Sequence, residues 1–185
     1  MKTRKIRLLS ALLALAMLLA LLPTAAFAAG ESTYTYQWNT DHSVTFKYTL
    51  DSENNATITG VAGALPADGV VVIPDKIGSY PVTAIGEAAF NDSNVQVVDL
   101  SNATSLEKIG RYAFFNCSQL KNVDLSKAAN LKEIGDKAFY SSGVDSVTFP
   151  QNSQLTKIGD SVFAHCNNLK NIEIPGTVTK IEGSA

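Results

Sequence analysis

Residues 109–125 read IGRYAFFNCSQLKNVDL, and closely similar stretches recur along the chain at a nearly constant interval. The isoleucine of an Ile-Gly pair stands at positions 85, 109, 134 and 158, and Ile181 begins a fifth copy, so the steps are 24, 25, 24 and 23 residues. A fixed period in the twenties indicates a leucine-rich solenoid, in which each coil buries its apolar side only by stacking on its neighbours.

The second half of each copy predicts a strand. It places three apolar residues at an unchanging spacing, in the sets Val95, Val98, Leu100; Leu120, Val123, Leu125; Val144, Val147, Phe149; and Leu169, Ile172, Ile174. Alternation at the end of each set is typical of a short strand, which predicts strands near residues 97–100, 122–125, 146–149 and 171–174. These strands should pair in parallel, about 4.8 Å apart.

Two other repeated positions carry structural predictions. The isoleucine of each Ile-Gly pair should point inward, and the glycine after it should lie where the backbone needs φ > 0 or where two backbones approach closely. These glycines are Gly86, Gly110, Gly135 and Gly159. The phenylalanine of each copy should stack on the next in an internal ladder, and its replacement by alanine should cost roughly 3–5 kcal/mol.

The full pattern, I-G-x-x-A-F-x-x-C-x-x-L-x-x-V-x-L-P, resembles the BspA-like leucine-rich repeats of bacterial surface proteins. The resemblance spans residues 56–185, and residues 109–125 and 158–175 match the pattern almost throughout. The departures leave the core pattern intact and occur at Ser93, Ser101, Ser126, Ser142, Val162 and Glu182. The resemblance implies an extracellular role, because BspA-like proteins are associated with binding of host extracellular matrix and with bacterial co-aggregation.

The first 28 residues have the features of a secretory signal peptide. Four basic residues precede an apolar run from Leu8 to Leu22, and Ala26-Phe27-Ala28 fits the cleavage site. The run of 15 residues is shorter than the roughly 20 that span a bilayer, and no other segment could cross a membrane. We therefore expect a secreted or cell-surface bacterial protein whose mature chain begins at Ala29.

The rest of the chain divides into two predicted parts, a small antiparallel β cap over residues 29–65 and the repeat solenoid over residues 66–185. Tyr34, Tyr36 and Trp38 alternate with polar residues and should help the cap to cover the first coil. An aromatic sugar-binding platform is the alternative interpretation of these three rings. Ala185 falls on the alanine of a further Ala-Phe pair, which leads us to expect a solenoid truncated at its C-terminus.

The charge balance argues against two classes of partner. Without residues 1–28 the chain has 157 residues, of which 11 are basic and 17 acidic, a net charge of −6. Proteins that bind nucleic acid need a basic patch, so we expect no nucleic-acid partner. An anionic membrane surface is an equally poor match.

No catalytic, cofactor-binding or metal-binding residues are predicted, and we expect no enzyme. Cys117 and Cys166 occupy the same repeat position two coils apart, a separation of about 10 Å. A disulfide requires Cα atoms within about 7 Å, so both should be free, buried thiols in a polar ladder with Ser93 and Ser142.

Two histidines are the remaining candidates for chemistry. His165 precedes Cys166, but neighbours in a turn usually point apart and no third residue is evident that would orient the imidazole. His42 follows Asp41 in a turn-rich stretch and has little support as a metal ligand.

The outer side of the predicted strands is the candidate partner-binding surface, called here the strand face. It comprises Val97, Asp99, Asn122, Asp124, Ser146, Thr148, Asn171 and Glu173. Like charges one coil apart repel, so its acidic column could attract a cation or a basic protein patch. The alternative is a solvated acidic face that keeps the sheet soluble.

A second column of charges lies just before the repeated isoleucines and is not expected to bind a partner. Its charges are opposite between neighbouring coils, Glu107 with Lys132 and Lys108 with Glu133. Such exposed pairs contribute a few tenths of a kcal/mol each, roughly, to a ladder.

The sequence favours a protein-binding or adhesive function, with an extracellular protein of the host matrix or a bacterial surface as partner. A carbohydrate- or cell-wall-binding module is an alternative that requires exposed aromatic rings, for which the repeats offer Tyr112, Phe115 and Tyr140. Phe115 and Tyr140 follow the ladder phenylalanine in consecutive copies and should form a small patch. A passive spacer for another domain is the third hypothesis.

Overall fold

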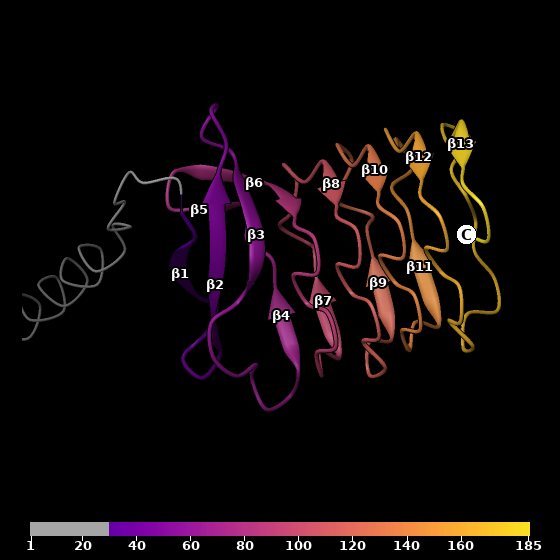
Figure 1. Ribbon diagram of the computed structural model, residues 1–185. Coiled ribbons are helices and arrows are strands. Elements are labelled where there is room, and N and C mark those ends of the chain that lie inside the picture. Colours follow the sequence, from indigo (N-terminus) through magenta and orange to yellow (C-terminus); the bar gives the residue numbers. More distant parts are fainter. Residues whose placement is uncertain (1–29) are drawn as a thin grey trace, which may run out of the picture.

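A computed structural model describes residues 30–185, which form a β-solenoid whose coils stack along one axis (Figure 1). The predicted signal peptide lies outside these residues. The described part contains strands and turns but no helix, and hence none long and apolar enough to cross a bilayer.

One parallel sheet follows the predicted strand positions. It consists of β4 (Val70–Val72), β7 (Val97–Asp99), β9 (Asn122–Asp124) and β11 (Ser146–Thr148), in the order β11-β9-β7-β4. The parallel pairing is confirmed, with Val98 opposite Val123 and Val123 opposite Val147. The last three strands each end one residue earlier than predicted.

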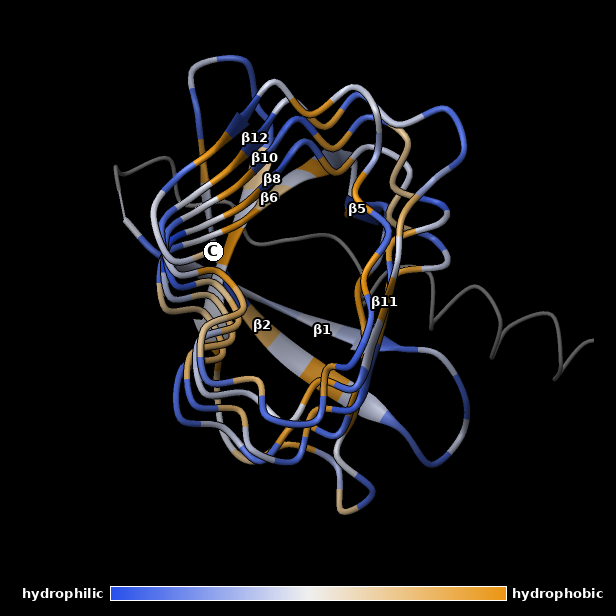
Figure 2. Cartoon of the chain, turned by 90° about the vertical axis from the view of Figure 1, so that its right-hand side faces the viewer, coloured by the Kyte–Doolittle hydropathy of each residue, from blue (hydrophilic) through white to orange (hydrophobic). Residues whose placement is uncertain are grey.

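A second parallel sheet was not predicted. The isoleucines lie in β6 (Tyr80–Ile85), β8 (Lys108–Ile109), β10 (Glu133–Ile134), β12 (Lys157–Ile158) and β13 (Lys180–Ile181). Four of the five isoleucines are buried as expected, whereas Ile181 is 57% exposed. The view along the axis places this sheet and β11 on different sides of the coil (Figure 2). Most of these strands have only two residues, too few to show an alternating pattern.

The prediction of a strand at residues 171–174 was wrong. No main-chain hydrogen bond joins this segment to β11, which is the last strand of its sheet in the described chain. A segment becomes a strand only by ladder pairing, and residues 171–174 pair with no strand of the described chain, so β11 is the last labelled arrow of its sheet (Figure 1). The gap that results is part of the candidate site below.

The glycines of the Ile-Gly pairs are needed for close approach and not for positive φ. A Cβ added to Gly110 would lie 2.7 Å from the carbonyl carbon of Gly86, and one added to Gly135 would lie 2.7 Å from the nitrogen of Arg111. Positive φ falls instead on non-glycine turn residues, among them Tyr112 at 57°. The backbones of successive coils therefore touch at the glycines.

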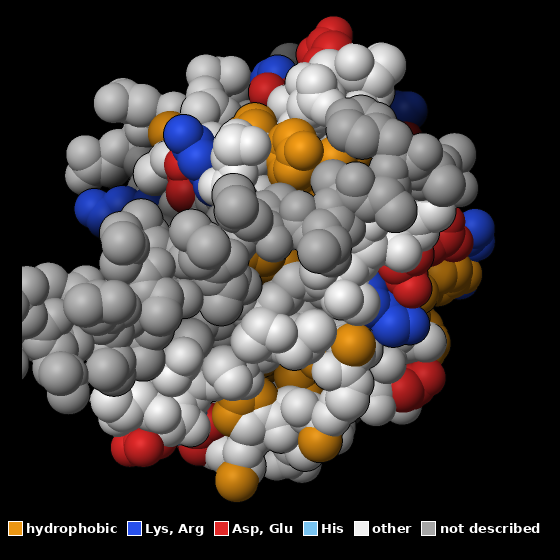
Figure 3. Space-filling model, turned by 90° about the vertical axis from the view of Figure 1, so that its left-hand side faces the viewer, with side chains coloured by type: hydrophobic (Ala, Val, Ile, Leu, Met, Phe, Trp, Pro, Cys, Tyr) orange, Lys and Arg blue, Asp and Glu red, His pale blue; other side chains and the backbone are white. Residues whose placement is uncertain are grey.

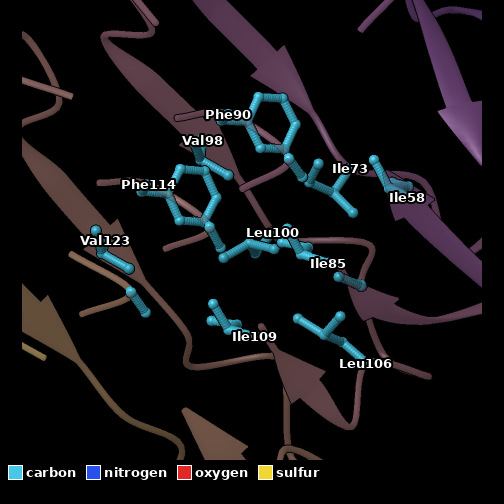
Figure 4. Packing of buried hydrophobic residues seen from close by; sticks show 14 of the residues in the cluster. Ile58, Ile73, Ile85, Phe90, Val98, Leu100, Leu106, Ile109, Phe114 and Val123 are labelled. Carbon is cyan, nitrogen blue, oxygen red and sulfur yellow. The ribbon is translucent and has the colours of Figure 1, made fainter. Parts of the chain in front are cut away.

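The phenylalanine ladder is confirmed. Successive rings of Phe90, Phe114, Phe139 and Phe163 have centroids 5.1, 5.2 and 5.6 Å apart and are within 6° of parallel. Figure 4 shows Phe90 and Phe114 stacked beside Val98, with Leu100 and Ile85 filling the interior. Phe114 and Phe139 are each 1% exposed, so the ladder lies within the core.

The N-terminal segment forms the expected antiparallel meander. It consists of β1 (Ser32–Gln37), β2 (Ser43–Leu50) and β3 (Ala56–Val61). β3 also pairs in parallel with β6 and so joins the meander to the second sheet. The short β5 (Lys76–Ile77) pairs antiparallel with β6. Phe46 and Ile58 are fully buried in the same core as the repeats. Figure 2 shows β1 and β2 crossing behind the ring of coils, so the meander covers the first coil.

The cap aromatics are only partly buried. Tyr34, Tyr36 and Trp38 pack against the core, and the last two stack with centroids 6.2 Å apart. Seen from this end, hydrophobic side chains are visible in several groups among the described residues (Figure 3).

The mixed-charge column forms the predicted ion pairs. Lys132 lies 2.8 Å from Glu107, and Lys108 lies 3.1 Å from Glu133. Lys157 extends the ladder by contacting Glu133 at 2.9 Å. Hydrogen bonds from Lys157 and then Lys108 lower the pKa of Glu133 below its ordinary value, which outweighs the effect of its partial burial.

Candidate functional site

The strand face is an ordered, mostly polar surface over the first three coils. The register places Asn122 beside Ser146 and Asp124 beside Thr148, and all four side chains are exposed. Val97 is 44% exposed and is the one apolar side chain of the strand face. The remaining members, Asn171 and Glu173, are exposed on the segment that does not pair with β11.

Two carboxylates of this face also act within the fold. An oxygen of Asp99 accepts a hydrogen bond from the Ser101 amide at 2.8 Å, and Asp124 accepts one from the Ser126 amide at 2.9 Å. Each carboxylate therefore caps the turn after its strand. Thr148 takes the equivalent position in the next strand, as the sequence predicts. Glu173, the last member of the predicted column, does not continue the register, because its segment does not pair with β11.

A groove opens where the strand face meets the last coil; we call it the edge groove. Its volume is about 590 Å³. Both polar and apolar groups line it, including the strand-face residues Ser146, Thr148, Asn171 and Glu173. The half-buried Val147 and Phe149 contribute apolar walls. A strand at the end of a sheet presents unpaired N–H and C=O groups, so β11 brings main-chain hydrogen-bonding capacity to this region.

Sequence reasoning identified four of the residues that line the edge groove but not the groove itself. The groove exists because residues 171–174 do not pair with β11, although their sequence matches the strand pattern of the earlier coils. Nothing in the local pattern distinguishes this copy from those that pair.

A second concave site lies on a turn of the coils; we call it the aromatic corner. Phe115 and Tyr140 stack with centroids 5.2 Å apart, which confirms that they lie together, and Tyr112 meets Phe115 edge-on at 5.4 Å. Lys137 places its ammonium 5.9 Å from both tyrosine rings. With Ala88 and Asn91 these side chains line a pocket of about 360 Å³.

The cysteines take the structural role that was expected. Both are free and buried, and their Sγ atoms lie 3.5 Å from the Ser93 hydroxyl and 3.3 Å from the Ser142 hydroxyl. The thiols of Cys117 and Cys166 donate to main-chain carbonyls of the preceding coil at 3.0 Å. Burial raises the pKa of both thiols, which disfavours the reactive thiolate.

The two histidines are engaged in surface contacts. His165 is exposed and packs edge-on against Tyr140, whereas the adjacent Cys166 side chain is buried. His42 bonds to Asn39 at 2.9 Å and to Asp68 at 2.8 Å, so its carboxylate partner is not the neighbouring Asp41. Residues 30–185 contain no group of three or more His, Cys, Asp or Glu arranged to hold a metal ion.

Comparison with known proteins agrees with this architecture. A leucine-rich-repeat protein from T. pallidum is 29% identical, with a TM-score of 0.64 over 75% of this chain and 61% of that protein. This chain thus spans less than two thirds of the length of that relative. The pneumococcal vaccine antigen PcpA is 22% identical, with a TM-score of 0.52 over 80% of this chain and 46% of the antigen, and shares the fold. No curated protein matches the sequence significantly.

The repeat region assigns the chain to a family. The model of the BspA type leucine-rich repeat region matches residues 82–185 in six copies, which is more than half of the chain. The match includes the buried isoleucines of the second sheet and the phenylalanines of the ladder. The chain belongs to the BspA-type leucine-rich-repeat family of proteins.

Proposed function

We propose that this is a secreted or cell-surface protein that binds an extracellular protein through the strand face and catalyses no reaction. The family is of the bacterial surface-protein type, and the first 28 residues have the pattern of a secretory signal peptide. A solenoid displays its coils as a continuous outer surface, which suits recognition of a large partner.

The observation that carries the proposal is the edge groove within the strand face. Four of the eight strand-face residues line it, beside the end strand of a sheet. An extended segment of a partner can add to such an edge by main-chain hydrogen bonds, with side-chain pockets providing specificity. The partner in this proposal therefore contributes an extended segment, which lies along β11 and contacts Val147 and Phe149.

Surface plasmon resonance against a panel of extracellular-matrix proteins and bacterial surface proteins tests the proposal. The protein, residues 29–185, is compared with the double variant Thr148→Lys/Asn171→Lys, which places two long cations at the groove. Both positions are exposed, and neither side chain makes a hydrogen bond among the described residues. The matched control is Gln119→Lys/Asn167→Lys, which adds the same charge at two exposed turn positions.

The proposal predicts saturable binding to at least one protein of the panel. The groove variant should weaken that binding by about tenfold or more, the loss expected when a central contact of an interface is removed. The control variant should bind within about twofold of the unmodified protein. Equal loss in both variants, or no binding by a folded sample, would contradict the proposal.

A further inference from the structure

We propose that the aromatic corner is a binding site for an acidic saccharide, separate from the strand face. In this site a pyranose ring packs against Tyr112 and Phe115, and a carboxylate or sulfate on the sugar meets the ammonium of Lys137. The proposal does not depend on the protein-binding function, because the two sites share no residue.

The site is concave because the first and second coils carry side chains of different size at two equivalent repeat positions. Ala88 in the first coil is equivalent to Tyr112 in the second, and Asn91 is equivalent to Phe115. The first coil thus has small side chains where the second has rings. Because Tyr140 stacks on only one face of Phe115, the opposite face is left facing the Asn91 side of the pocket.

Two of the three rings that line the pocket meet at nearly a right angle. The planes of Tyr112 and Phe115 are 87° apart, so together they form a corner and not a flat platform. A pyranose ring has faces of C–H groups and a rim of hydroxyls, which complement aromatic walls and polar groups such as the Asn91 amide and the tyrosine hydroxyls. The pocket volume of about 360 Å³ falls in the range of small-ligand sites.

The charges around the corner select an anionic ligand. Lys137 forms no ion pair among the described residues, and its ammonium lies near both tyrosine rings. The guanidinium of Arg111 lies 4.5 Å from the centre of the Tyr112 ring and donates a hydrogen bond to the Tyr112 hydroxyl at 3.0 Å. Lys137 is the one charged residue among those that line the pocket, and its ammonium favours a ligand with a carboxylate or sulfate.

Saturation-transfer difference NMR with matched pairs of sugars tests the site. The probes are oligogalacturonate with its methyl ester, and sialyllactose with lactose, so that each pair compares an acidic sugar with its neutral counterpart. The test variant is Lys137→Asn, because asparagine tolerates the positive φ of 54° at this position. The matched control is Lys121→Asn, which removes one exposed charge outside the pocket.

The proposal predicts that at least one acidic sugar binds, that its neutral counterpart binds several-fold more weakly, and that Lys137→Asn weakens the acidic sugar by about tenfold. Lys121→Asn should leave binding unchanged. A second variant, Phe115→Leu, should reduce saturation transfer to the ring protons of the sugar while the protein remains folded by circular dichroism. The proposal is overturned if no probe binds, if neutral and acidic sugars bind equally, or if both lysine variants lose binding alike.

Discussion

Replacing Phe114 by alanine is the perturbation that most directly probes how the coils are held together. Its ring is 1% exposed and lies between Phe90 at 5.1 Å and Phe139 at 5.2 Å, so alanine removes two stacked contacts and leaves a cavity. Burial and cavity effects of this kind cost about 3–5 kcal/mol for Phe→Ala. The two lost stacks place the expected loss at the upper end, since each aromatic pair adds about 0.5–1.5 kcal/mol beyond its buried area.

The matched comparison is Phe163→Ala at the end of the same ladder. Phe163 is only half-buried and stacks on a single ring, Phe139, at 5.6 Å. It therefore has one aromatic pair fewer and less buried area to lose, and its replacement should cost at least about 1 kcal/mol less than that of Phe114.

Urea unfolding followed by circular dichroism measures both changes, with the free energy of unfolding taken from the midpoint and slope. The reasoning predicts a clearly larger loss for Phe114→Ala than for Phe163→Ala. Equal losses, or a larger loss for Phe163→Ala, would refute the view that ladder stacking within the core determines the stability of the coils.

Three further predictions concern close approach, charge and thiol chemistry. Gly135→Ala should destabilise the fold by about 1–3 kcal/mol, because the added Cβ would lie 2.7 Å from the Arg111 main-chain nitrogen. The control Gly176→Ala has open space around the added Cβ and should leave the thermal unfolding midpoint nearly unchanged. Lys157 and Lys108 lower the folded-state pKa of Glu133, so the ion pairs stabilise the fold above the ordinary carboxyl value of 4.5, and this contribution is lost as pH falls through the depressed pKa. Glu133→Gln should therefore reduce stability by less than about 1 kcal/mol at neutral pH and by nothing at the acidic end of a melting series; a constant difference at all pH values would contradict the charge argument. Burial raises the pKa of Cys117 and Cys166, so Ellman's reagent should react slowly with the native protein. After unfolding it should react readily with both thiols. Fast reaction of either thiol in the native protein would show that this thiol is accessible.

The interior of the solenoid could be predicted from the sequence because its positions repeat. The Phe ladder and the inward isoleucines each follow from one residue type that returns in every coil. The free cysteines follow from the separation of two coils between Cys117 and Cys166. Of the two alternatives predicted for Gly110 and Gly135, close approach is observed and positive φ is not. Positive φ occurs instead at turn residues such as Tyr112, two positions after Gly110.

The features that were missed depend on contacts between coils that no local pattern encodes. A two-residue strand such as Lys108–Ile109 is defined by its neighbours in the sheet and has no period of its own. The edge groove arises because one copy of a strand motif remains unpaired. The aromatic corner was partly foreseen, through Phe115 and Tyr140, but its concavity depends on Ala88 and Asn91 in the preceding coil.

The most direct test of the central claim is hydrogen–deuterium exchange, read by mass spectrometry, on the protein with and without the partner that surface plasmon resonance identifies. The account predicts that the partner slows exchange in residues 145–151 and 171–177, which line the edge groove or adjoin it, with little change at residues 108–109 and 133–134 of the opposite sheet. Protection confined to the isoleucine strands or to the cap, with the groove exchanging as in the free protein, would contradict it.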